Sequence, residues 1–232
     1  MVKSDIISAA KANRFYWLGR YVDRVYMTLH LLNKCYDRMI DGAPDEYMNF
    51  WQRLDAGGCY ATEEEFTLGM MYDDTNPTSV LSALMRAMNN AILLREDILS
   101  ESLSYIEMSL ALMKRCKAAH ETNITQLQPV IDWSLAFWGS AEQRLHNPRS
   151  LSLMMVGRHV ENIDMLLRFG YSFRRVSLAY DSLKRYARDL DDEVDREAAK
   201  KLDVLIVEDR FDLTNSDYRD QLIGYVNQLV RV

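Results

Sequence analysis

The sequence predicts an all-α protein built from long helices. Glycine and proline are scarce, nine and four among 232 residues, whereas a chain rich in sheet needs many more turn residues. Apolar side chains recur at helical spacing over long stretches, and a charged share of 27% leaves enough apolar residues for a buried core. We expect one helical domain over residues 1–232.

Charge, cysteine content and hydropathy indicate what kind of all-α protein this is. A net charge of −6 argues against a nucleic-acid-binding protein, which needs a basic surface. The three cysteines are far apart and odd in number, as expected for free thiols in a reducing compartment. No stretch approaches the roughly 18 apolar residues of a membrane span, and the N-terminus lacks the apolar core of a signal peptide. We therefore expect a cytoplasmic protein without a membrane segment.

The first predicted helix runs from about 4 to 40, because Asp41-Gly42 and Pro44 end it. Apolar residues lie on both of its sides, so it should be buried at the centre of the fold. A shorter helix over 45–54 follows, and Gly57-Gly58 breaks it.

The middle of the chain should form three helices. Thr62 caps a short helix that begins with Glu63-Glu64-Glu65, whose carboxylates suit the positive helix end. Pro77 takes the first position of a helix of some forty residues, over about 77–120, because its missing N–H costs nothing there. The next helix covers about 122–146.

Three more segments complete the predicted fold. Pro148 restarts the chain before a helix over about 149–180, in which Gly170 marks a kink. The polar segment 185–201 should be a solvated helix end and turn, because charge-dense segments rarely enter a core. Residues 215–232 form a last amphipathic helix.

Part of the first helix is repeated within the chain. Phe15–Met27 reads FYWLGRYVDRVYM and Leu153–Met165 reads LMMVGRHVENIDM, at an offset of 138 residues. Such self-similarity predicts a duplicated unit, with copies at about 4–120 and 122–232 related by a pseudo-twofold axis.

A charged band should lie between these two Gly-Arg helices. Gly19 and Gly157 should let them approach closely, since a residue without Cβ leaves room for a neighbouring backbone. Arg95 falls within the apolar stripe of the long middle helix, so it should pair with Asp23 or Glu161, because an unpaired buried charge is costly. The candidate site residues are Arg20, Asp23, Arg24, Arg95, Arg158 and Glu161, walled by Tyr16 and Trp17.

Two interpretations of this Arg–acid band stay open. In the first, arginines and acids form a buried salt-bridge network that fixes the register of the helices. In the second, the band lines a pocket in which arginines grip a carboxylate or phosphate in bidentate fashion. A pocket open to solvent would favour an enzyme, and a sealed network would favour a structural role.

No motif for catalysis or for a cofactor accompanies the band. A di-iron bundle needs Glu-x-x-His pairs, which the chain lacks, and it has only four histidines. Gly-x-Ser-x-Gly and glycine-rich phosphate loops are absent as well. We therefore expect no metal site, no cofactor and no ATP binding by this chain, and the sequence leans against an enzyme.

Four elements together resemble the bacterial alpha-E domain family. Tyr16–Arg24 is similar to its opening pattern of Tyr-Trp, Gly-Arg-Tyr and Glu-Arg, and Asn76–Ser79 to its Asn-Pro-Ser-Ser element. Asn90–Glu101 resembles the helix that follows, and Gly157–Glu161 resembles the second Gly-Arg helix. The resemblance covers most of Ala12–Phe169.

The chain departs from the family pattern at four positions. Asp23 replaces a glutamate, and Tyr26 stands where another glutamate is common. Asn162 replaces an arginine of the family pattern, and Leu103 replaces a tryptophan. If the family's acids form a working site, these changes weaken it here.

The resemblance implies an all-helical cytoplasmic protein and a biological context. Genes of the family commonly neighbour, or are fused to, a circularly permuted ATP-grasp ligase and a transglutaminase-like peptidase. The expected function is an accessory or ligand-holding module that works with an ATP-grasp peptide or amide ligase in small-peptide biosynthesis. Two alternatives stay open: an enzyme of peptide or amide metabolism that uses the Arg–carboxylate site, and a purely structural or oligomerisation protein such as a homodimer.

Overall fold

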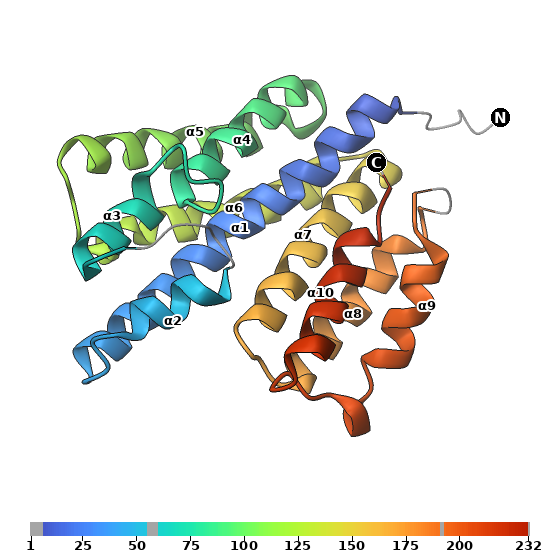
Figure 1. The fold of residues 1–232 in the computed structure, drawn as a ribbon. Coiled ribbons are helices and arrows are strands. Elements are labelled where there is room, and N and C mark those ends of the chain that lie inside the picture. The colour runs from blue at the N-terminus through green and yellow to red at the C-terminus, as the bar shows by residue number, and fades with distance from the viewer. Residues whose placement is uncertain (1–6, 55–59, 191–192, 232) are drawn as a thin grey trace. The chain divides into compact units, whose positions relative to one another are not determined.

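The computed structural model describes residues 7–54, 60–190 and 193–231. These residues form ten α-helices and two short 3-10 helices without a β-strand, and the only extended pairing among them is an isolated bridge between Val194 and Val230 (Figure 1). The predicted all-α class is confirmed. The predicted break at Gly57-Gly58 lies outside the described residues, as does Cys59.

The chain divides into two compact units. The first, called the α7–α10 unit, combines Met1–Arg20 with Leu145–Val232, and the second, called the α2–α6 unit, is Tyr21–Arg144. Helix α1, Ala9–Ile40, contributes its first part to one unit and the rest to the other. These boundaries differ from those of the predicted repeat copies, and the duplication stays a prediction.

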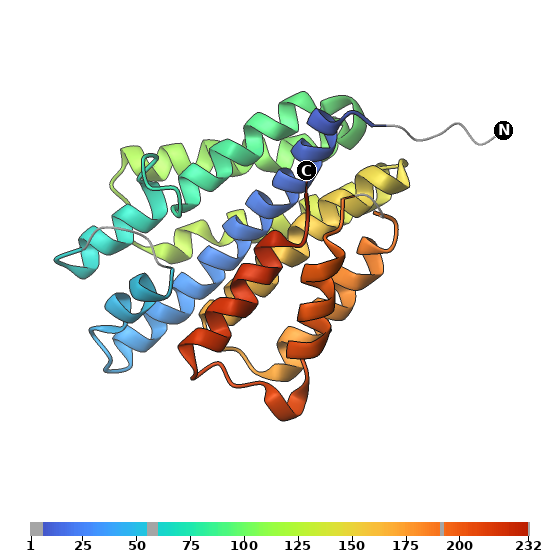
Figure 2. The same ribbon diagram turned by 45° about the vertical axis from the view of Figure 1, so that its right-hand side comes forward.

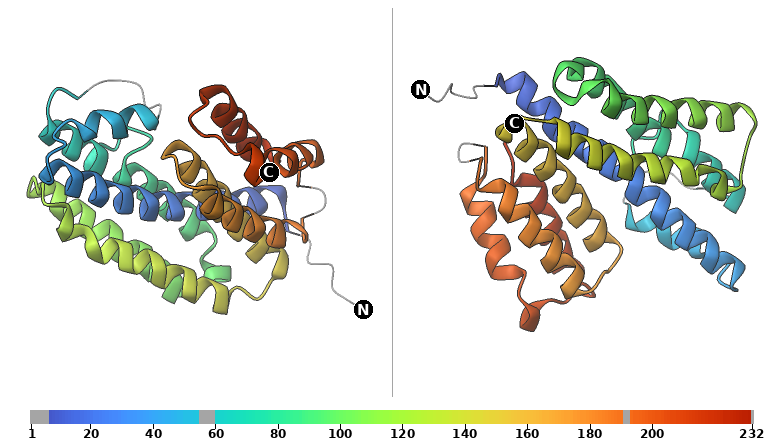
Figure 3. Two further views of the ribbon diagram at one scale, coloured as in Figure 1. Left: turned by 90° about the horizontal axis from the view of Figure 1, so that it is seen from below. Right: turned by 180° about the vertical axis from the view of Figure 1, so that it is seen from behind.

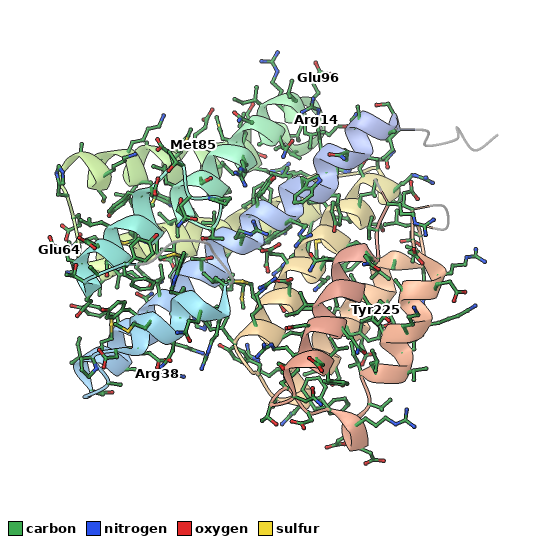
Figure 4. All side chains as sticks on the ribbon, viewed as in Figure 1. Arg14, Arg38, Glu64, Met85, Glu96 and Tyr225 are labelled. Atoms are coloured by element: carbon green, nitrogen blue, oxygen red, sulfur yellow. The ribbon has the colours of Figure 1, made fainter. Side chains whose placement is uncertain are left out.

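The α2–α6 unit is built around α5, which packs on both α4 and α6, while α3 packs on α4 (Figure 3). Its buried centre includes Phe66, Met70, Met113 and Phe137. Exposed side chains cover the outside, among them Glu64 and Met85, which are labelled in Figure 4. The helices are α2 (Glu46–Arg53), α3 (Glu63–Tyr72), α4 (Val80–Leu93), α5 (Arg95–Ala118) and α6 (Gln128–Arg144), with the 3-10 helix η1 (Ile124–Leu127) before α6.

In this unit one helix begins as the sequence predicts and another does not. The Thr62 side chain accepts a hydrogen bond from the backbone N–H of Glu65, as predicted for α3. Helix α4, however, begins at Val80 with Ser79 as its cap, so Pro77 lies before the helix and not at its first position. Asn76 holds the preceding turn, because its Oδ1 accepts from the backbone N–H and the hydroxyl of Thr78.

The predicted forty-residue helix over 77–120 is not continuous. Helix α4 ends at Leu93, α5 begins at Arg95, and inside α5 the backbone of Leu99 leaves the helical region with φ 62° and ψ 164°. A residue in that conformation interrupts the 3.6-residue period. Arg95 is consequently exposed on the first turn of α5. The prediction that it lies in a buried apolar stripe is therefore also wrong.

The α7–α10 unit surrounds α7, which packs on α8 and α10, and α10 packs in turn on α9 (Figure 2). The predicted helix over 149–180 is two helices, because Gly170, at φ 67°, ends the first. The segment 185–201, predicted to be a solvated helix end, contains the start of a further helix capped by Asp195. The helices are α7 (Pro148–Arg168), α8 (Phe173–Ala187), α9 (Arg196–Leu205) and α10 (Ser216–Gln228), with the 3-10 helix η2 (Glu208–Arg210) after α9.

Candidate functional site

The first part of α1 and helix α7 touch backbone to backbone at two glycines. A Cβ on Gly19 would stand 2.0 Å from the carbonyl oxygen of Met154, and a Cβ on Gly157 would stand 2.0 Å from that of Tyr16. Neither distance is compatible with any side chain, so both positions require glycine at this separation. The close approach predicted from the two Gly-Arg motifs is confirmed, and it places Arg20 against α7.

Arg20 is the buried centre of the site. Its guanidinium is bound from two sides: Nε donates to Oε2 of Glu161 at 2.8 Å, and Nη2 donates to Oδ1 of Asn227 at 2.8 Å. Nη1 points to the hydroxyl of Tyr16 at 3.5 Å, a long contact. The residue is only 6% exposed and Glu161 only 1%. A buried charge pair with added hydrogen bonds is the arrangement that offsets the cost of leaving water.

The network continues from Asn227 into α7. Asn227 donates through Nδ2 to Oδ1 of Asp164 at 2.7 Å, and Nε of Arg168 donates to Oδ2 of the same carboxylate at 2.7 Å. Glu161, Asp164 and Arg168 are spaced three and four residues apart, so they share one face of α7. The exposed amide of Asn227 thus joins two buried acids and two arginines into a single chain of contacts.

Two aromatic rings pack against the same guanidinium. The Arg20 Cζ atom lies 5.2 Å from the centre of the Trp17 ring and 5.9 Å from that of Tyr16, and the two rings meet edge to face at 5.6 Å. Such contacts stabilise a desolvated cation. Tyr16, Trp17, Arg20 and Glu161, all predicted site residues, are therefore brought together.

Electrostatics keeps Arg20 charged. Its burial works to lower the pKa of the guanidinium, but the Glu161 carboxylate beside it, with smaller contributions from Tyr16 and Asp164, raises that pKa above its usual value overall. Burial also raises the pKa of Tyr16, an effect that the positive charge of Arg20 partly opposes. Arg20 is thus a fixed positive charge that is paired with the Glu161 carboxylate.

The remaining predicted residues are Arg158, Asp23, Arg24 and Arg95. Arg158 is half-buried on α7, next to Gly157. Asp23 and Arg24 belong to the α2–α6 unit, where Asp23 is buried and Arg24 half-buried on α1, and Arg95 is exposed at the start of α5. Sequence reasoning missed Asp164 and Asn227. The spacing of Asp164 from Glu161 offered a signal for the first, and no pattern marks the second.

Thiol and metal chemistry finds little support in the described part of the chain. Cys35 and Cys116 are free and buried, and burial raises the pKa of Cys35 to about 12, so neither thiol is activated as a nucleophile. No three histidine, cysteine or acidic side chains gather closely enough there to hold a metal ion. Among the same residues, none of the helices combines the length and apolar character needed to cross a bilayer.

Fold and network together define an all-helical domain in which two Gly-Arg helices cross at a pair of glycines and enclose one arginine. The model of a family named Alpha-E, described as a predicted alpha-helical domain with a conserved ER motif, matches residues 8–207. The chain belongs to this Alpha-E family. It contains no Glu-Arg dipeptide, and Asp23-Arg24 is the Asp-Arg pair that follows the first Gly-Arg. Neither a curated protein nor a solved structure matches the chain.

Proposed function

We propose that this chain is an accessory helical module that works beside an ATP-grasp peptide or amide ligase in small-peptide biosynthesis. The state of Arg20 supports the proposal most. Its Nε and Nη2 donors are already bound to Glu161 and Asn227, and the residue is almost completely buried. A pocket that grips an anionic substrate needs a free guanidinium edge, whereas a module that holds a partner needs only a rigid scaffold and suitable outer surfaces.

Exposed apolar side chains on α4 support a docking role as well. Met85 and Ile92 are exposed and seven residues apart, so they lie along one face of the helix, and Leu93 is exposed beside them. Single exposed apolar residues are common, but several along one helix face are typical of a surface that contacts another protein.

The proposal is tested by producing the chain together with an ATP-grasp ligase of the kind whose genes commonly neighbour those of the Alpha-E family. We expect the two proteins to elute as one complex in size-exclusion chromatography. We also expect ADP release by the ligase, with amino acids and short peptides as substrates, to rise when the chain is added.

The matched control is the Gly19→Ala variant, whose folding should be damaged while its charge is unchanged. It should neither form the complex nor raise ADP release. The proposal fails if the ligase shows full activity and elutes alone in the presence of the wild-type chain. It also fails if the purified chain by itself joins or cleaves the amide substrates.

A further inference from the structure

Helix α8 and the residue that follows it carry an unusual charge for this protein. Residues 173–188 contain five basic side chains and a single acid, so the segment carries +4, while the whole chain carries −6 and the remainder therefore −10. The basic residues are Arg174, Arg175, Lys184, Arg185 and Arg188, and the acid is Asp181. Positive charge is thus concentrated on one helix of an otherwise acidic chain.

The inner face of α8 is occupied. Val176, Tyr180 and Leu183 are buried, and α8 packs on α7. On the opposite side Arg174, Leu178 and Arg185 are exposed. Steps of 100° per residue bring these three within about 40° of one another, and the two arginines lie about 16 Å apart along the axis at 1.5 Å per residue.

Asp181 lies on the same line, three residues after Leu178 and four before Arg185, but the two arginines form no ion pair with it. Lys184 pairs with Asp181 at 3.2 Å and with Asp203 at 3.7 Å, which uses the nearby acids. In the described part of the chain, no carboxylate forms an ion pair with Arg174 or Arg185. Leu178, between them, is 60% exposed. Two guanidiniums around an exposed leucine form a surface, here called the α8 face, that offers both charge and apolar contact.

We propose that the α8 face binds an acidic helical segment of a partner protein. The segment would be about three turns long, with carboxylates at both ends to reach Arg174 and Arg185, and an apolar side chain between them to cover Leu178. Arginine suits this role, because its planar fork binds a carboxylate through two parallel hydrogen bonds and because arginine is enriched in protein interfaces. The inference rests on the proposed function and names a docking surface of the module in addition to the exposed apolar residues of α4.

Other anionic partners fit the α8 face less well. Nucleic acid requires a broad basic footprint, and the chain outside this segment is strongly acidic. An anionic membrane would attract the arginines, but Asp181 is exposed on the same face between Leu178 and Arg185, and a single leucine gives little apolar area to insert. A helix with discrete carboxylates can place them opposite the arginines and away from Asp181.

The test is fluorescence anisotropy with the purified full chain and a labelled 18-residue peptide of glutamate, alanine and leucine, with glutamates toward both ends and leucines in the middle. We expect binding that weakens with added salt. The double variant Arg174→Glu with Arg185→Glu should weaken it by about tenfold or more, because each contact to a carboxylate becomes repulsive.

A matched double variant on α5, Lys114→Glu with Arg115→Glu, makes the same change in net charge at two exposed residues of the other unit. It should leave peptide binding within about twofold of the wild type, since distant surface charges are largely screened. Circular dichroism spectra that coincide with the wild type show that both double variants are folded.

Three results would overturn the inference. The first is that the peptide does not bind, and the second is that both double variants bind it equally. The third is that the chain binds an anionic membrane or nucleic acid more tightly than the peptide, measured with vesicles of phosphatidylserine and phosphatidylcholine and with an 18-nucleotide single strand. The proposed function is judged separately. If the ligase complex still forms with the Arg174→Glu, Arg185→Glu variant, the proposed role of the α8 face is wrong and the proposed function stands. If the chain binds the peptide but forms no ligase complex, the proposed function is wrong and the α8 face stands.

Discussion

Gly19 and Gly157 stand in the same relation to each other's helix: each lies against the carbonyl oxygen three residues before the other glycine, those of Met154 and Tyr16. The contact is reciprocal, so neither helix can accept a side chain there without moving its partner. This crossing places Arg20 and Glu161, which follow the two glycines by one and four residues, within 2.8 Å of each other. The backbone contact and the ion pair are therefore expected to depend on one another.

Gly157→Ala should destabilise the protein by about 3 kcal/mol, near the upper end of over-packing costs, because the added Cβ would stand 2.0 Å from a backbone oxygen. Gly139→Ala on α6 is the matched control, since a Cβ there meets nothing within 4 Å. It should stabilise the protein by about 0.5–1 kcal/mol through helix propensity. Urea unfolding measures the stability of both variants. If Gly157→Ala and Gly139→Ala change the stability equally, α1 and α7 do not touch at Gly157.

Arg20→Met should cost about 3–5 kcal/mol of unfolding free energy, because it removes the positive charge that is paired with the buried Glu161 carboxylate. Replacing both residues, Arg20→Met with Glu161→Leu, should recover most of that loss, since an apolar pair of similar volume needs no compensation. A double-mutant cycle by urea unfolding gives the coupling. Additive effects of the two single changes would show that the ion pair contributes nothing specific.

His159 makes the stability of the fold depend on pH. Burial, followed by the charges of Arg158 and Arg185, lowers the pKa of the imidazole to about 4 from 6.5. The unfolded chain therefore binds a proton more readily than the folded one between these values. The stability that the neutral ring contributes is present above pH 6.5 and is lost as the pH falls towards 4, by at most about 3 kcal/mol.

The comparison is between wild type and His159→Phe, which keeps a ring to stack on Tyr186. Urea unfolding between pH 7.5 and 4.5 should show the wild type losing more stability than the variant as the solution becomes acidic. Parallel stability curves for the two proteins would mean that the imidazole titrates alike in the folded and unfolded chains.

Sequence periodicity located the helices well but not their interruptions. The cap at Thr62 and the contact between the two Gly-Arg helices follow from side-chain chemistry that is local in sequence. The break at Leu99 does not, because leucine has no preference for a positive φ and nothing near it predicts one. A single register carried across the junction at Leu94 and on through Leu99 placed Arg95 in the core, whereas the side chain is exposed.

The site shows the same limit. Arg20 and Glu161 were found because they occupy matching regions of the two similar stretches. Asn227 lies 207 residues from Arg20, on a helix whose sequence gives no reason to expect an amide at a charged centre. Pairing across such a separation depends on how the helices pack, and the spacing of residues in a single sequence does not contain that information.

Asn227→Ala tests whether the buried ion pair or the exposed amide of Asn227 stabilises the network. The amide bridges Arg20 and Asp164 through hydrogen bonds of 2.8 and 2.7 Å, yet the residue itself is exposed. Water can replace these two hydrogen bonds, so the cost should be only about 0.5–1.5 kcal/mol, well below that of Arg20→Met. Gln228→Ala, an exposed neighbour on α10, is the control and should change little. A loss with Asn227→Ala as large as with Arg20→Met would place the stabilising contact at the surface rather than in the buried ion pair.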